Sequence, residues 1–170
     1  MLFHHFNKII HEELFPKILE NFDSEKFNVP AYYQETRFYS LKILLLCLEK
    51  FNGKKFFNNK QVEFLQIVLD AIEGEKDPRN ILIKFEICAK ICKFLDKKLI
   101  KDYSKTIFNT LEIYYPIEFT PPKNSPERIT AEDLINGLNE AFGSNENYIE
   151  SLIELFSGNM FSLFLYLNLF

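Results

Sequence analysis

A proline-rich stretch between residues 115 and 130 constrains the fold of this chain more than any other feature. It holds four of the chain's seven prolines, namely Pro116, Pro121, Pro122 and Pro126. Each proline removes a backbone donor and pushes the preceding residue toward extended geometry, so this stretch cannot be an α-helix. Two large apolar side chains, Ile117 and Phe119, lie among the prolines, and a solvated linker would need neither. We therefore predict an extended segment that packs across neighbouring helices.

The chain on both sides of this stretch has the apolar spacing of amphipathic helices. Gly53 is expected to close the second helix and Asn58-Asn59 to cap the third. Such helices, joined by short turns, are typical of an all-α, HEAT/armadillo-like α-solenoid of antiparallel helix pairs, but also of a compact bundle. Periodicity alone leaves both architectures open. The expected helices cover residues 3–22 with an interruption at Pro16, 31–51, 59–74, 78–95, 97–114, 130–142 and 146–156.

Turn and capping residues mark two helix starts most sharply. Gly74 is expected to end the third helix, Asp77 to cap the fourth, and Pro78 to stand in its first turn, where its missing donor costs nothing. Thr130 and Asp133 have the spacing of a capping box with aspartate in the place of glutamate. They predict the start of the sixth helix.

Composition predicts one globular domain and excludes several function classes. The chain has 170 residues, of which 47% are hydrophobic, and a net charge of −4. We expect a helical domain over residues 1–157, followed by a hydrophobic tail over residues 158–170. The net negative charge and the lack of a basic block disfavour direct nucleic-acid binding. No apolar run is long enough for a membrane span, and three cysteines in apolar helical patterns indicate a reducing compartment.

Cys88 and Cys92 are the strongest candidates for chemistry, because they lie one helical turn apart and could place two thiolates on a metal. Their stripe also contains Ile81, Phe85 and Leu95, which favours buried small apolar residues. A small thiol or metal enzyme that uses the two cysteines remains an alternative. Two other candidates are weaker. The histidines lack the spacing of a metal site. A cluster of acidic residues lies beside Lys76 and Arg79, which favours charge pairing and capping over cation binding; the cluster consists of Asp70, Glu73, Glu75 and Asp77.

Motifs for nucleotide cradling or for a serine nucleophile do not occur in the sequence. We therefore predict no catalytic, cofactor-binding or metal-binding residue and no cofactor, and we expect that the chain is not an enzyme. Partner-binding residues stay unassigned. If the ring of Phe119 is buried, Phe119→Ala should destabilise the fold by about 3 to 5 kcal/mol.

Two motifs carry a family resemblance: G-E-K-D-P-R-N-I-L at residues 74–82, and Y-Y-P-I-E-F-T-P-P-K-N-S-P-E-R-I-T-A-E-D-L at residues 114–134. With the helical hairpin between them, they resemble the N-terminal HEAT region of the MMS-nineteen family. Residues 14–48 match it more weakly, and the resemblance covers about residues 14–156. This family is known as the large adaptor of the cytosolic iron-sulfur protein assembly targeting complex and as a DNA repair and transcription factor.

The resemblance implies a non-catalytic scaffold of the nucleus and cytoplasm that binds no cluster itself. Its partners would be iron-sulfur assembly factors and client apoproteins such as helicases and polymerases. The family's C-terminal repeats have no counterpart here, so we expect an N-terminal fragment whose tail comes from an unspliced intron or a frameshift; the alternative is a tail that caps the last helix pair. A general helical protein-interaction domain, unrelated to iron-sulfur assembly, is the other open alternative.

Overall fold

The computed structural model describes residues 17, 28–50, 60–121 and 129–166, and within these ranges the only regular structure is helical. Two short 3-10 helices, η2 and η3, accompany the α-helices. The elements are η2 (Val29–Ala31), α3 (Gln34–Lys50), α4 (Gln61–Ile72), α5 (Pro78–Phe94), α6 (Lys97–Asp102), α7 (Ser104–Glu112), α8 (Ala131–Gly143), η3 (Glu146–Tyr148) and α9 (Ile149–Tyr166).

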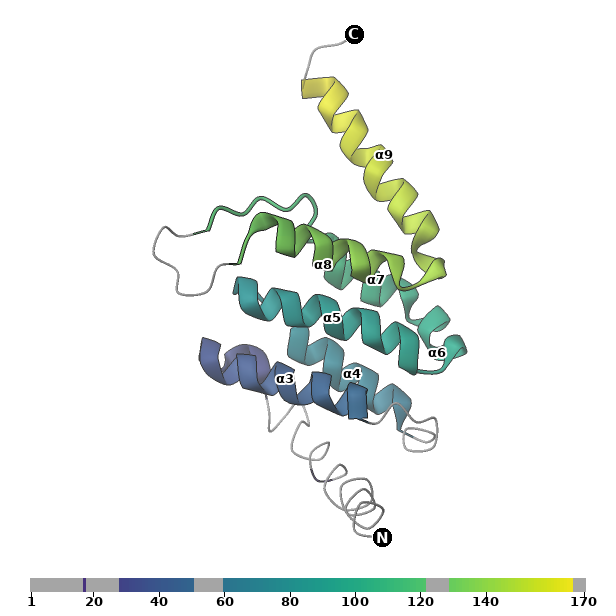
Figure 1. Ribbon diagram of the computed structural model, residues 1–170. Helices are drawn as coiled ribbons and strands as arrows, with labels where there is room; N and C mark the ends of the chain where they lie inside the picture. The colour runs from purple at the N-terminus through teal and green to yellow at the C-terminus, as the bar shows by residue number, and fades with distance from the viewer. Residues whose placement is uncertain (1–16, 18–27, 51–59, 122–128, 167–170) are drawn as a thin grey trace.

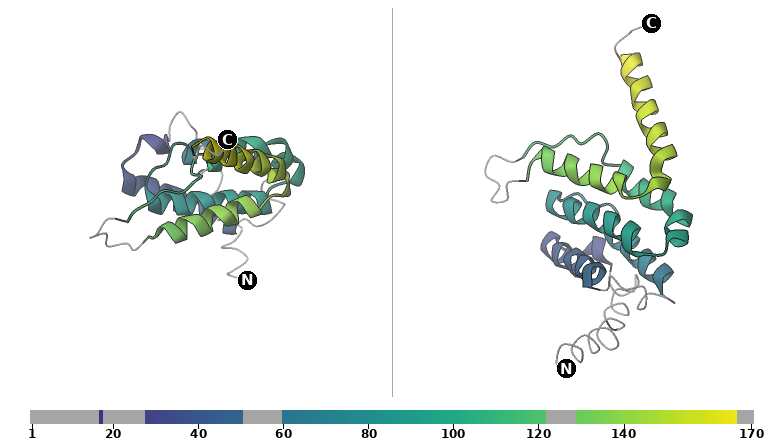
Figure 2. Two further views of the ribbon diagram at one scale, coloured as in Figure 1. Left: turned by 90° about the horizontal axis from the view of Figure 1, so that it is seen from above. Right: turned by 45° about the vertical axis from the view of Figure 1, so that its right-hand side comes forward.

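The helices form a stack of two layers (Figure 1). Helices α3, α5 and α8 lie side by side in one layer, with α5 packed between the other two, while α4 and α7 lie behind them. Successive helices therefore alternate between the layers, as in an α-solenoid, which confirms the predicted all-α solenoid class. The two further views in Figure 2 show that α9 leaves the stack after contacting η3 and α7.

One continuous core holds the two layers together. Because α3, α4, α5, α7 and α8 have apolar residues at three- and four-residue spacing, each places a stripe of side chains between the layers. Ring contacts extend the core across α7, α8 and η3, where Phe108 lies 5.3 Å from Phe142 and 5.5 Å from Tyr148, centroid to centroid. The buried stripes include Leu41, Leu44 and Leu48 of α3, Phe64, Leu65 and Val68 of α4, Phe85, Ile87 and Ile91 of α5, Ile107, Phe108 and Leu111 of α7, and Leu134 and Leu138 of α8.

The predicted turn between α4 and α5 is confirmed. Gly74 has a positive φ of 62°, which glycine adopts without the clash of a Cβ atom. The Asp77 side chain accepts hydrogen bonds from the backbone N–H groups of Arg79 and Asn80, and Pro78 is the first helical residue. Local interactions thus cap the start of α5.

The capping box that begins α8 is also confirmed. The Thr130 hydroxyl accepts a hydrogen bond from the backbone N–H of Asp133, and the Asp133 carboxylate accepts one from the backbone N–H of Thr130. Both bonds satisfy donors that the first turn of a helix leaves free. They fix the point at which the chain returns from the proline-rich stretch to the stack.

Three helix boundaries differ from the prediction. The expected helix over residues 97–114 is two helices, α6 and α7, which meet at Tyr103 with φ −101° and ψ 6°. The N-cap of α4 is Lys60, without a side-chain hydrogen bond, in place of Asn58-Asn59. The last helix continues to Tyr166, past its expected end at residue 156. No proline or glycine marks Tyr103, so the sequence carried no signal for that break.

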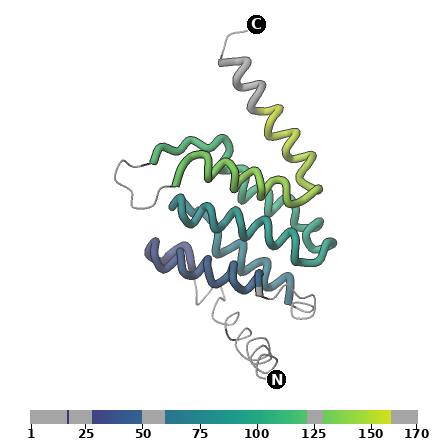
Figure 3. The backbone as a smooth tube through the Cα atoms, viewed as in Figure 1, coloured from purple at the N-terminus to yellow at the C-terminus, as the bar shows by residue number. Residues whose placement is uncertain are grey.

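The backbone trace in Figure 3 draws residues of uncertain placement in grey. Several predictions lie outside the described residues. They are the helix over residues 3–22 with Pro16, the closing residue Gly53, the pair Asn58-Asn59, and the prolines Pro122 and Pro126. Of the helices in the described ranges, none is both long and apolar enough to cross a membrane.

Candidate functional site

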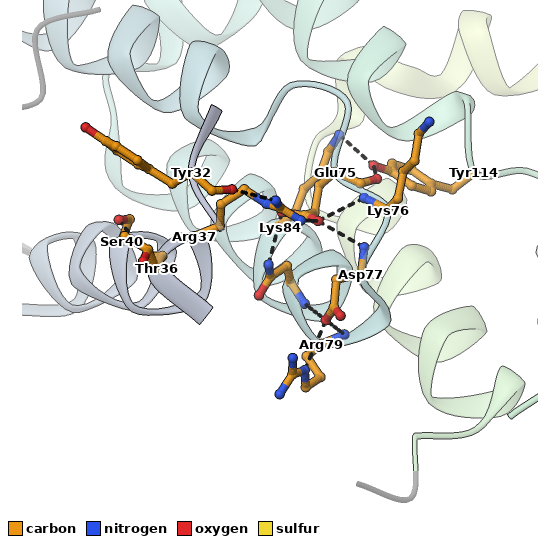
Figure 4. A network of polar contacts seen from close by, with 11 residues as sticks. Tyr32, Thr36, Arg37, Ser40, Glu75, Lys76, Asp77, Arg79, Lys84 and Tyr114 are labelled. Atoms are coloured by element: carbon orange, nitrogen blue, oxygen red, sulfur yellow. Dashed lines mark hydrogen bonds and ion pairs between the residues drawn. The ribbon is translucent and has the colours of Figure 1, made fainter. Parts of the chain in front are cut away.

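Glu75, in the turn between α4 and α5, is the centre of a buried polar network (Figure 4). Its side chain is 2% exposed and accepts two hydrogen bonds from Arg37 of α3, from Nε at 2.9 Å and from a terminal nitrogen at 3.1 Å. The backbone N–H groups of Lys76 and Asp77 donate to Oε1, each at 2.9 Å, and Asn80 Nδ2 donates to Oε2 at 3.0 Å. One carboxylate therefore joins α3 to the start of α5.

Tyr114, at the end of α7, brings the proline-rich stretch to the same turn. Its hydroxyl donates to the backbone carbonyl of Glu75 at 2.7 Å and accepts a hydrogen bond from Lys84 Nζ at 3.2 Å. Lys84 is fully buried, and its Nζ lies 4.6 Å from the centroid of the Tyr114 ring. Residues far apart in sequence thus fix the first residues of the extended segment against α5.

Burial and hydrogen bonding in this network shift two pKa values. Burial of Glu75 acts to raise its pKa, but the hydrogen bonds from Arg37, from the two backbone N–H groups and from Asn80 together hold it below its usual value. Burial of Lys84 lowers the pKa of its ammonium group to about 8, although nearby groups, among them Glu75, act in the opposite direction. Glu75 is therefore ionised at neutral pH, whereas Lys84 titrates at a pH close to neutral.

Two carboxylates of the acidic cluster at this turn are engaged by arginines of the chain itself. Glu75 is paired with Arg37, and Asp77 caps α5 and pairs with Arg79 at 3.1 Å. In the described ranges, no three or more His, Cys, Asp or Glu residues are grouped so that they could hold a metal ion. The prediction of pairing and capping is confirmed for Glu75 and Asp77, although the main partner of Glu75 is Arg37 and not one of its neighbours in sequence.

Cys88 and Cys92 lie on the inner side of α5, and each has polar side chains nearby. Cys88 Sγ is 3.9 Å from the Thr110 hydroxyl, and Cys92 Sγ is 3.3 Å from the Tyr148 hydroxyl. Burial raises the pKa of the Cys88 thiol to about 12 and also raises that of Cys92. Both are protonated at neutral pH, which counts against their use as thiolate ligands or nucleophiles.

The extended segment, residues 115–121, packs on the helices as predicted. Exposure alternates along it: Ile117 and Phe119 are half-buried against the core, whereas Pro116, Glu118 and Thr120 are exposed. Such alternation places every second side chain on the helices, as in a strand. The condition set for a large effect of Phe119→Ala, a fully buried ring, is met only in part, because this ring keeps part of its surface in water.

A hollow of about 290 Å³ lies beside this segment. Its walls come from the segment, from the start of α5 and from Leu134 of α8. Most lining side chains are apolar, and the charged ones are Lys76 and Glu118. The volume corresponds to one or two large side chains, so the hollow suits an anchor residue better than a cofactor. Its apolar walls include Ile81, Phe85, Ile113, Ile117, Phe119 and Leu134.

A second, wider hollow of about 790 Å³ follows the contact between α5 and α8. The two helices approach closely at Gly137, where an added Cβ atom would lie 3.2 Å from a ring carbon of Phe85. Its lining mixes charges of both signs, including Glu86, Lys90 and Lys93. Lys90 is already paired with Glu49 and Glu86, so this surface has no single charge preference.

Sequence reasoning missed the central residues of the network. Arg37 lies 38 positions from Glu75, and Tyr114 lies 39 positions from it, so no local pattern relates them. Lys84 stood in an otherwise apolar stretch of α5, between Ile83 and Phe85. A charged residue on the buried side of a helix was the available signal that a partner must exist.

These features define an α-solenoid whose buried polar groups hold helix pairs together. A family model described as "Dos2-interacting transcription regulator of RNA-Pol-II" matches residues 2–162. The chain therefore belongs to the MMS19 N-terminal family.

Curated relatives support the same assignment. The chain is 29% identical over 130 residues to the MMS19 DNA repair/transcription protein of Saccharomyces cerevisiae, covering 74% of this chain and 12% of the relative. It is 36% identical over 92 residues to the human MMS19 nucleotide excision repair protein homolog, covering 51% and 8%. The chain is 34% identical over 97 residues to the Xenopus laevis homolog, and this match covers 57% of this chain and 9% of the relative. The matched region is thus about a tenth of each relative's length. No solved structure matches the chain.

Proposed function

We propose that this chain is the N-terminal arm of a non-catalytic scaffold of the cytosolic iron-sulfur protein assembly targeting complex. In this role it would hold assembly factors and client apoproteins of DNA replication and repair, in the nucleus and cytoplasm, while clusters pass to the clients. The observation that carries the proposal is the match of residues 2–162 to a family whose curated members are named as DNA repair and transcription proteins.

The geometry supports a scaffold over a thiol enzyme. The buried polar groups around Glu75 are occupied in joining α3, α5 and α7, and the two thiols of α5 are protonated. The surface of the stack, by contrast, carries hollows bounded by apolar residues. Stacked helix pairs present an extended face on which several proteins can dock together, which is what transfer between an assembly factor and a client requires.

Affinity capture of the tagged 170-residue chain from its native cells tests the proposal. The control bait is a helical-repeat chain of similar length and charge from an unrelated family. We expect iron-sulfur assembly factors and cluster-dependent helicases or polymerases to be enriched over the control. Reproducible capture of other proteins alone would replace the proposal with a general interaction domain, and capture indistinguishable from the control would overturn it.

Metal analysis addresses the thiol alternative separately. The chain, purified without chelator, should contain zinc and iron far below one atom per molecule, and Cys88→Ala should leave that content unchanged. Stoichiometric metal that is lost in Cys88→Ala would contradict the scaffold proposal and establish the cysteines as ligands.

A further inference from the structure

The extended segment has an open backbone edge. Within the part of the chain that the structure describes, the amide and carbonyl groups of residues 117–120 have no hydrogen-bond partner, whereas the preceding amides of Tyr114 and Tyr115 bond to Leu111 and Glu112. A strand with unpaired amides and carbonyls is a template for pairing with a second extended chain.

The side chains of the segment hold this edge in place. Ile117 and Phe119 face the helices, and the segment is tied at its start by the Tyr114 hydrogen bonds and by the Tyr115 ring, 5.3 Å from that of Phe156 in α9. A fixed edge loses little conformational freedom when a partner binds, so backbone pairing there is favourable. The apolar hollow of about 290 Å³ lies directly beside it.

We propose that residues 117–120 form a docking edge at which an extended peptide of a partner protein adds as a strand. The peptide pairs with the backbone of these residues and places an apolar side chain in the adjacent hollow. Strand addition of this kind takes affinity from main-chain hydrogen bonds and specificity from pockets for alternate side chains. This inference rests on the proposed protein-binding role.

Charge selects the chemistry of the peptide. Glu118 is the exposed, charged side chain in the middle of the edge, and it also borders the hollow, where Lys76 is the other charged side chain. A peptide that pairs alongside places its own outer side chains opposite Glu118, where lysine or arginine is attractive and glutamate repulsive. The occupant is therefore an extended peptide in which apolar residues alternate with basic ones.

Fluorescence anisotropy with two synthetic probes tests the charge preference. The probes are fluorescein-labelled heptapeptides, one alternating valine with lysine and one alternating valine with glutamate. We expect saturable binding of the valine–lysine peptide below about 1 mM and much weaker binding of the valine–glutamate peptide. In Glu118→Lys the preference should reverse. No binding of either peptide to the wild-type chain, or the same preference in both chains, would overturn the proposal.

Proline scanning tests the backbone pairing itself. Successive N–H groups of a strand point to opposite edges, so Thr120→Pro removes a donor from one edge and Phe119→Pro from the other. Valine at the same position is the matched control for each. One of the two prolines should weaken valine–lysine binding about fivefold or more relative to its valine control, and equal binding by all four variants would contradict strand addition.

The two proposals can fail separately. If the valine–lysine peptide does not bind but the chain captures iron-sulfur clients from cells, the scaffold role stands and the docking edge is wrong. If the peptide binds with the expected preferences but no client is captured, the edge stands and the assignment to iron-sulfur assembly is wrong.

Discussion

The turn between α4 and α5 and the extended segment after α7 are both irregular and both contain proline, yet they treat their polar groups in opposite ways. In the turn, the Glu75 carboxylate is bonded to Arg37, to Asn80 and to the two following backbone N–H groups. In the extended segment, residues 117–120 pair with nothing in the described part of the chain. The first region is a closed joint between helices, and the second presents unsatisfied groups to a partner.

Loss of the hydrogen bonds to Glu75, which form the joint between the helices, should produce the largest decrease in stability. Glu75→Ala removes the acceptor of Arg37, of Asn80 and of two backbone N–H groups, and leaves these donors in a buried site. We expect a loss of about 3 to 5 kcal/mol in the free energy of unfolding. Urea denaturation measures it, with the exposed neighbour Glu73→Ala as a control that should change stability by less than about 0.5 kcal/mol. A loss under about 1 kcal/mol for Glu75→Ala would mean that the network is not a structural joint.

Proline at matched positions separates the two regions most sharply. Lys76→Pro removes an N–H that donates to Glu75, whereas Thr120→Pro removes an N–H without a partner in the described ranges. Lys76→Pro should lower the free energy of unfolding by about 1 to 3 kcal/mol, and Thr120→Pro should lower it by less than about 0.5 kcal/mol. Thermal or urea unfolding of both variants checks this, and equal losses would show that the segment's backbone is as engaged as that of the turn.

Phe119→Ala measures how firmly the segment is attached. The ring is half-buried, so the variant should lose about 1 to 2 kcal/mol and not the roughly 3 to 5 kcal/mol of a fully buried ring. Chemical denaturation with the exposed neighbour Thr120→Ala as reference provides the measurement. A loss close to that of the reference would mean that the side chain contributes no packing, and the segment would then not be held for docking.

Lys84, which meets both regions through Tyr114, predicts a smaller, pH-dependent effect. Burial lowers its pKa from 10.5 to about 8. Between these values the unfolded chain binds the proton and the folded chain does not, so this group makes stability rise with pH, by at most about 1.4 kcal/mol per pH unit. Lys84→Met should remove this contribution, so that its free energy of unfolding rises less, or falls more, than that of the wild type from about pH 8 to about pH 10. If the free energies of unfolding of the wild type and of Lys84→Met changed in parallel with pH, the Lys84 ammonium group would be exposed to solvent.

The closed joint and the open edge also differ in how far sequence could predict them. Gly74, Asp77 and the Thr130–Asp133 box act within four residues, and local rules located them correctly. The prolines predicted that the segment is extended, and the apolar Ile117 and Phe119 predicted that it packs on the helices. Arg37 and Tyr114 reach Glu75 from distant helices, and such contacts depend on how the helices stack, which no local pattern encodes.

The docking edge was invisible to sequence reasoning for a different reason. Prolines show that a segment is not helical, but they do not show whether its remaining N–H and carbonyl groups find partners. Only the position of residues 117–120 beside the hollow, with Ile117 and Phe119 turned inward, reveals that this face of the backbone is free of partners among the described residues.

Residue-resolved amide hydrogen exchange, followed by NMR, compares the two regions most directly. The amides of Lys76 and Asp77, which donate to Glu75, should exchange slowly, whereas those of residues 117–120 should exchange at nearly the rate of an unstructured peptide. Slow exchange at the first two positions and fast exchange at the other four would support a closed joint and an open edge. Protection of residues 117–120 equal to that of the turn would contradict the account.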